Sequence, residues 1–172
     1  MGKLFKAALT LTAAFLVLAA SAWAGPEENP DRFFWGRVVN VQDGDTITVV
    51  RSNDSLDLVI IRLYGIDAPE SGQAFGTQAA SKLRRLVHKK IVQVEIMQKS
   101  DRYGRIVGIV KRDGDDVSMD LLYEGLAWVY PKFCRRDKPC KRYWAIARKA
   151  EKARMGLWKD KNPMSPWKWR KK

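Results

Sequence analysis

The chain has 172 residues and a formal net charge of +13, with 32 Lys and Arg against 19 Asp and Glu. This length is enough for one domain with a core of its own and excludes an array of several domains. A chain this basic attracts polyanions such as nucleic acid, anionic lipid or acidic polysaccharide. Charge alone does not choose among these partners, and it can also serve only solubility.

The first 24 residues have the pattern of a signal peptide. Lys3 and Lys6 precede an uncharged run rich in Ala and Leu, residues 7–20, and Ala22 and Ala24 provide the small-x-small end of a cleavage site. A membrane anchor is the alternative, but a spanning helix needs about 20 apolar residues. We therefore expect cleavage after Ala24, export to the periplasm or the medium, and no stable membrane insertion afterwards.

Cys134 and Cys140 are the only two cysteines and lie close together in a basic loop. In an oxidising compartment, we expect them to form a disulfide. A zinc site is less consistent with the composition, because two thiols and the single His88 do not complete a four-ligand set.

Apolar periodicity predicts the elements of an α+β fold. The strand-like segments are residues 33–41, 46–50, 56–64, 91–97 and 105–111, and the helical ones are 75–89, 118–124 and 139–155. Three strands, a helix and two further strands match the order of an OB-fold, a small five-stranded β-barrel, here with three helices. We expect this domain to span residues 25–158, followed by a basic, Trp-rich tail at 159–172.

One stretch, Arg62 to Glu70, places charged side chains directly after an apolar run. The run, residues 56–63, is typical of a buried strand, and Pro69 cannot donate to a strand ladder. One cation and two carboxylates therefore leave a strand end within nine residues, which suits phosphate and metal chemistry. The simpler interpretation is a strand followed by a polar turn.

Asp45 and Asp67 are candidate metal ligands. Asp45 opens the second predicted strand and Asp67 follows the third, so both carboxylates can reach one rim of the barrel if the third strand also meets the first. Two hard oxygen ligands, with the backbone carbonyl of Ala68 and water, suit Ca²⁺ or Mg²⁺ better than zinc. Alternatively, Asp43 and Asp45 are ordinary residues of an Asp-Gly turn.

Further residues suit phosphodiester chemistry. Glu70 could activate a water molecule, and the forked guanidinium groups of Arg62 and Arg105 could bind phosphate oxygens. Tyr103 could hydrogen-bond a phosphate or stack on a base. Each has a simpler interpretation, as a solvated loop acid, a surface cation or a packed aromatic ring.

Four segments, in order and at similar spacing, resemble the staphylococcal nuclease family. They are Asp43-Gly44-Asp45-Thr46, Arg62 to Glu70, Asp101-Arg102-Tyr103-Gly104-Arg105 and Glu124-Gly125-Leu126-Ala127. The resemblance covers about residues 37–158. It implies an OB-fold, Ca²⁺-dependent phosphodiesterase that acts on DNA and RNA and leaves 3′-phosphate ends.

The resemblance also implies roles for individual residues. Asp45 and Asp67 match the metal-ligating aspartates, and Glu70 matches the glutamate proposed as general base. Arg62 and Arg105 match the two catalytic arginines.

Further positions either match the family or depart from it. Tyr103 matches a tyrosine near the substrate phosphate, with Arg102 beside it as a substrate-binding candidate. Asp43 matches an acid close to the metal. Ala68 replaces a Thr that gives its backbone carbonyl to the metal, so the ligand is kept. Tyr130 is an uncertain candidate for base stacking.

A second hypothesis is an OB-fold module that binds nucleic acid or an envelope polyanion without cleaving it. The presence of every motif acid and arginine favours the enzyme. The tail, with Trp158, Trp167 and Trp169 among basic residues, either contacts a membrane or polyanion or packs back on the domain. The preference for DNA or RNA and the oligomeric state stay open.

Overall fold

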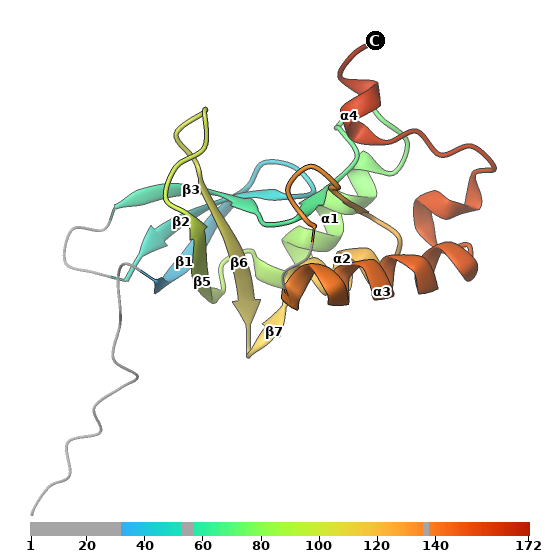
Figure 1. The fold of residues 1–172 in the computed structure, drawn as a ribbon. Coiled ribbons are helices and arrows are strands. Elements are labelled where there is room, and N and C mark those ends of the chain that lie inside the picture. Colours follow the sequence, from blue (N-terminus) through green and yellow to red (C-terminus); the bar gives the residue numbers. More distant parts are fainter. Residues whose placement is uncertain (1–31, 53–56, 136–137) are drawn as a thin grey trace, which may run out of the picture.

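A computed structural model of the chain describes residues 32–52, 57–135 and 138–172 (Figure 1). The predicted signal peptide, residues 1–24, lies outside these ranges. Within them, no helix is both long enough and apolar enough to cross a membrane.

The core of the fold is a closed barrel of five strands. They are β1 (Phe33–Val41), β2 (Thr46–Arg51), β3 (Leu58–Leu63), β5 (Ile91–Gln98) and β6 (Ile106–Arg112). The ladder order β3-β2-β1-β5-β6 is antiparallel, and a parallel pairing of β3 with β6 closes it. Alternate residues such as Ile47 and Val49 point inward and are fully buried. This confirms the predicted α+β class and OB-fold barrel.

The barrel closes through another pair of strands than the prediction for Asp45 and Asp67 required. That prediction needed the third strand to meet the first. The second neighbour of β3 is β6, not β1, with Arg62 in register with Val107. The reason is topological, because β1 already has β2 on one side and β5 on the other. Three short strands were also not expected: β4 (Ile66–Asp67), β7 (Asp115–Asp116) and β8 (Trp128–Val129).

Three main helices accompany the barrel, as predicted: α1 (Gly76–Val87), α2 (Val117–Tyr123) and α3 (Lys138–Lys152) (Figure 1). Helices α1 and α2 contact barrel strands, and α3 packs on α2 and β8. The apolar face of α1 buries Leu83 and Val87. Helix α3 ends before the predicted Met155, because Arg154 takes a left-handed conformation at φ 51°.

The C-terminal tail packs on the domain. A 3₁₀ helix, η1 (Gly156–Lys159), follows α3, and the chain then turns back to a short helix, α4 (Pro166–Trp169) (Figure 1). Trp158 and Trp167 both contact Trp128, with ring centroids 4.4 and 5.6 Å away. The sequence left open whether the tail contacts a membrane or polyanion or packs back on the domain. For Trp158 and Trp167, packing on the domain is observed.

A disulfide joins Cys134, in the loop after β8, to Cys140 in the first turn of α3. Their Cα atoms are 5.3 Å apart, and both residues are buried. The predicted pairing is confirmed, and it fixes the loop that carries Tyr130 to the start of α3.

Candidate active site

The stretch from Arg62 to Glu70 forms the floor of the candidate site. Strand β3 ends at Leu63, and Gly65 then turns the chain at φ 73°, where an added Cβ would lie 2.7 Å from the Cys134 sulfur. After this turn, β4 pairs with β8, and Asp67 faces Trp128 in the ladder. Asp67 is thus held on regular backbone rather than in a free loop.

Asp45 and Asp67 meet at one guanidinium group. Arg62 pairs through Nη1 with Asp45 and through Nη2 with Asp67, the latter at 2.6 Å. Asp45 lies just before Thr46, which faces Arg62 across the β2–β3 ladder, and it also accepts a hydrogen bond from the Ala68 N–H at 2.6 Å. The two carboxylates therefore converge on one guanidinium, Asp45 from the residue before β2 and Asp67 from β4. They meet without the contact between β3 and β1 on which the prediction was made conditional.

Both carboxylates are enclosed, with Asp45 4% exposed and Asp67 fully buried. Two negative charges this close in a buried site repel each other strongly unless a cation lies between them. Arg62 supplies that charge. Burial lowers the pKa of the Arg62 guanidinium, and the charge of Asp67 opposes this shift.

A tight turn presents Glu70. The side-chain oxygen of Gln73 accepts a hydrogen bond from the Glu70 N–H at 3.2 Å, and the Gln73 N–H donates to the Glu70 carbonyl at 2.9 Å. Gly76 lies so close that an added Cβ would be 1.9 Å from the Glu70 carbonyl oxygen. The backbone under Glu70 is therefore fixed by side-chain and backbone contacts together.

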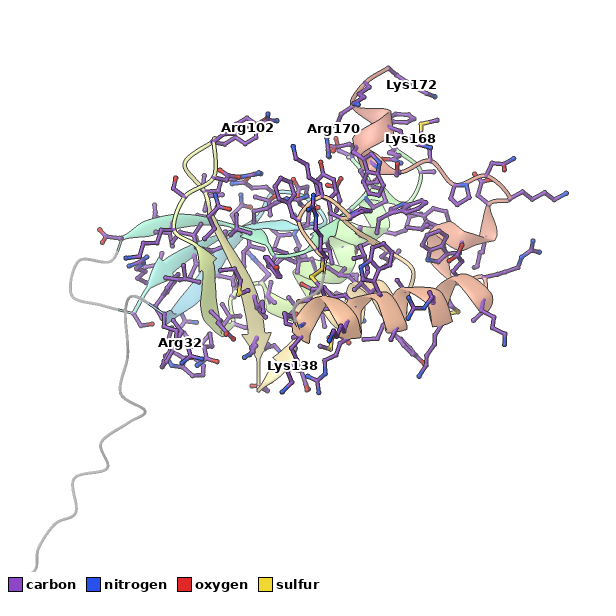
Figure 2. All side chains as sticks on the ribbon, in the orientation of Figure 1. Arg32, Arg102, Lys138, Lys168, Arg170 and Lys172 are labelled. Atoms are coloured by element: carbon purple, nitrogen blue, oxygen red, sulfur yellow. A yellow bond between two sulfur atoms is a disulfide. The ribbon has the colours of Figure 1, made fainter. Side chains whose placement is uncertain are left out.

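The opposite rim comes from the β5–β6 hairpin (Figure 2). Arg105 does not contact the acids of the floor, because Asp101 holds it through two hydrogen bonds of 2.9 and 2.7 Å. Tyr103 is 65% exposed, and the guanidinium groups of Arg102 and Arg105 lie 4.6 and 5.1 Å from its ring centroid. This rim offers one aromatic face and two cations.

Floor and rim enclose one open cavity of about 710 Å³. It is lined by all the predicted site residues apart from the disulfide: Asp45, Arg62, Asp67, Ala68, Glu70, Arg102, Tyr103, Arg105 and Tyr130. Tyr130 lies at the edge, with Trp167 stacked on it at 5.2 Å and an interplanar angle of 7°. One face of Tyr130 is thus covered by the tail.

Sequence reasoning missed one residue of the site, Arg170. Its guanidinium reaches into the cavity from the C-terminal end of α4 and contacts Asp67 and Glu70. The basic character of the tail was noted from the sequence, but no local pattern separates Arg170 from its basic neighbours Lys168, Lys171 and Lys172.

The acidic centre fits a hard divalent cation. Within the described ranges, no cluster of three or more His, Cys, Asp or Glu side chains could hold a metal by itself. Asp45 and Asp67 nevertheless offer two carboxylates that already share one cationic partner, Arg62, and Ala68, the predicted carbonyl ligand, lines the same cavity. Oxygen donors completed by water suit Ca²⁺ or Mg²⁺ rather than zinc.

Comparison with known proteins agrees with this geometry. The model of the family described as "Staphylococcal nuclease homologue" matches residues 60–160, which is more than half of the chain. The chain belongs to the staphylococcal nuclease family. The resemblance found in its motifs is thereby confirmed.

Several curated relatives match most of the chain. A protein of Shigella flexneri named "Micrococcal nuclease" is 37% identical over 177 aligned residues, covering 96% of this chain and 93% of the relative. An "Uncharacterized endonuclease" of Escherichia coli is 41% identical over 136 residues, covering 78% and 84%. "Protein ParB" of Escherichia coli is 35% identical over 167 residues, covering 92% and 86%.

The family match includes Arg62, Asp67, Glu70 and Arg105 and ends ten residues before Arg170. The matched range thus holds most of the floor and the rim of the cavity, whereas Asp45 precedes it. The C-terminal tail from residue 161 lies beyond the residues that the family model matches.

Proposed function

We propose that the protein is an exported, Ca²⁺-dependent endonuclease that hydrolyses phosphodiester bonds of DNA and RNA. The observation that carries the proposal is the convergence of Asp45, Asp67, Glu70, Arg62 and Arg105 on one open cavity. The family membership and the relatives named as nucleases support the same reaction class.

In this proposal, Asp45, Asp67 and the carbonyl of Ala68 would hold the cation. When bound, Ca²⁺ would neutralise charge on the scissile phosphate and position it for attack. The N–H of Ala68 fixes the Asp45 carboxylate, so one ligand is preorganised before the cation arrives. Asp43, whose carboxylate accepts from the Asp45 N–H at 2.9 Å, supports the same turn.

Glu70 takes the proton of the attacking water, from a turn whose backbone is fixed by Gln73. Arg62 and Arg105 neutralise the charge that develops on the phosphorane-like transition state. Arg62 approaches from the floor and Arg105 from the rim, so a phosphate in the cavity would lie between two guanidinium groups. Departure of the 5′-oxygen leaves a 3′-phosphate end.

Tyr103 and Arg102 bind the substrate from the hairpin rim, and Tyr130 from the edge of the cavity beside Trp167. Aromatic rings and guanidinium groups recognise bases and phosphates rather than a sugar hydroxyl, which agrees with action on both DNA and RNA. Export is supported by the disulfide, since such bonds persist in oxidising compartments.

The test is digestion of plasmid DNA and of a single-stranded RNA by the purified chain, with Ca²⁺ or with a chelator. We expect cleavage only with Ca²⁺, products with 3′-phosphate ends, and a loss of at least about 100-fold in rate for Glu70→Gln. Glu151→Gln, on the outer face of α3, is the matched control. Binding of both nucleic acids without cleavage in either condition would identify a binding module instead.

A further inference from the structure

The C-terminal segment, defined here as residues 163–172, is docked beside the acidic centre. Ser165 and Pro166 are buried, and the Gln73 amide donates to the Met164 carbonyl at 2.6 Å. Trp167 stacks on Tyr130 and meets Trp128 edge-on. The same Gln73 side chain that fixes the Glu70 backbone therefore also holds this segment.

Figure 2 shows Arg170 at the end of α4. Docking of the segment places its guanidinium on two acids of the floor, Asp67 and Glu70. Its Nη2 lies 2.8 Å from Asp67 Oδ2, and its Nη1 lies 3.2 Å from Asp67 Oδ1 and 2.5 Å from Glu70 Oε1. The planar guanidinium of Arg170 thus donates to Asp67 through both Nη1 and Nη2, and Nη1 also donates to Glu70. Arg is suited to this because its fork of donors is rigid and always charged.

Glu70 depends on this contact for its position. Its side chain is 37% exposed, and in the described ranges Arg170 is the side chain bonded to its carboxylate. Without a cation between them, the Glu70 and Asp67 carboxylates would repel each other, and Glu70 would turn toward solvent. The Arg170 guanidinium keeps its charge at every relevant pH, as arginine does in proteins, so the contact with both carboxylates is always charge-assisted.

Arg170 lines the cavity without filling it. The volume of about 710 Å³ is present with Arg170 in place, and it is within the size range of small-molecule sites. The buried Ser165 and the ring contacts of Trp167 also make the segment part of the folded domain rather than a loose plug. Both features indicate that the C-terminal segment contributes to activity and does not block the site.

We propose that Arg170 is a positioning residue of the active site, which holds Glu70 beside Asp67 for attack on the phosphodiester. This inference rests on the proposed nuclease function. If Ca²⁺ binds Asp67 as proposed, Arg170 and the cation would both interact with that carboxylate, and the contact with Arg170 would weaken Ca²⁺ binding. Loss of Arg170 should therefore free Asp67 for Ca²⁺ and at the same time leave Glu70 misplaced.

The experiment compares the wild type with Arg170→Ala, Arg170→Lys and the matched control Lys171→Ala, which removes one charge from the adjacent position. Turnover is measured on a short oligonucleotide, and Ca²⁺ binding is measured by calorimetry without substrate. For Arg170→Ala, we expect kcat to fall about 30-fold with KM changed less than about threefold, since a misplaced group costs up to about 100-fold. Ca²⁺ should bind about three- to tenfold more tightly.

Lys171→Ala should change neither kcat nor the Ca²⁺ affinity by more than about twofold, because the contacts of Arg170 with Asp67 and Glu70 stay intact. Millimolar guanidinium ion should restore part of the activity of Arg170→Ala and leave the wild type unchanged. Arg170→Lys keeps the charge but cannot bridge two carboxylates in one plane, so we expect about a tenfold lower kcat. This milder variant decides the question if Arg170→Ala does not fold.

Three results would overturn the inference. A wild-type kcat in both Arg170 variants refutes a positioning role, and a higher kcat with tighter Ca²⁺ binding identifies the segment as an inhibitory arm. A lower kcat with weaker Ca²⁺ binding indicates general damage to the fold. Absence of cleavage by the wild type refutes the proposed function itself, which is a separate outcome.

Discussion

Removal of the Arg62 guanidinium tests how the acidic centre is held together. In Arg62→Ala, Asp45 and Asp67 lose the cation between them while both carboxylates stay enclosed. Breaking a buried ion pair by removing one partner costs roughly 3–5 kcal/mol. Arg170 still contacts Asp67, so we expect the lower end, about 3 kcal/mol at pH 7 without divalent cations. For a chain of this size, that lowers Tm by about 6–12 °C.

The assay is urea unfolding followed by Trp fluorescence, with chelator or with millimolar Ca²⁺. Because Ca²⁺ can replace the missing charge, it should stabilise Arg62→Ala more than it stabilises the wild type. Lys111→Ala is the control, since Lys111 and its partner Glu95, 2.9 Å away, are both partly exposed to solvent, and such pairs contribute about 1 kcal/mol. An unfolding free energy of Arg62→Ala within 1 kcal/mol of the wild type in chelator would refute the reasoning.

Two further predictions concern stability away from the cavity. Replacing Cys134 and Cys140 by Ser should lower the free energy of unfolding by about 2 kcal/mol, measured in urea against the oxidised wild type. Burial raises the pKa of Asp116, so the folded state takes up this proton at higher pH than the unfolded chain does. As pH falls through that raised pKa, the stability of the wild type should rise relative to Asp116→Asn, which still caps α2; equal pH profiles would contradict this.

Much of the fold was predictable because its signals are local. The alternation of Ile47 and Val49 with polar neighbours marks a half-buried strand wherever that strand lies in space, and α1 follows from a 3.6-residue period in the same way. The closure of the barrel was not predictable from such patterns. The pairing of β3 with β6 joins Arg62 to Val107, and no periodicity within either strand specifies its partner.

In the candidate site, too, the local motif was predictable and the pairing of its side chains was not. Asp67 and Glu70 were singled out because they follow a strand end within one short motif, and the structure places them in one cavity with Asp45 and Arg62. Arg105 was predicted to act at the same place, and it lines the cavity, but its present partner is Asp101. A motif specifies which groups are available, whereas their pairing depends on distances that only the folded chain sets.

The sequence alone indicated which segments form strands and helices, that Cys134 and Cys140 could pair, and which acids and arginines are candidates for the site, because each of these signals lies in residues close along the chain. Tertiary structure alone decided that Arg170 belongs to the site. It lies 103 residues from Asp67, and it reaches that carboxylate because Trp167 docks on Tyr130 and Gln73 holds Met164. Contacts of this kind arise from packing between distant segments, for which one sequence carries no local signal.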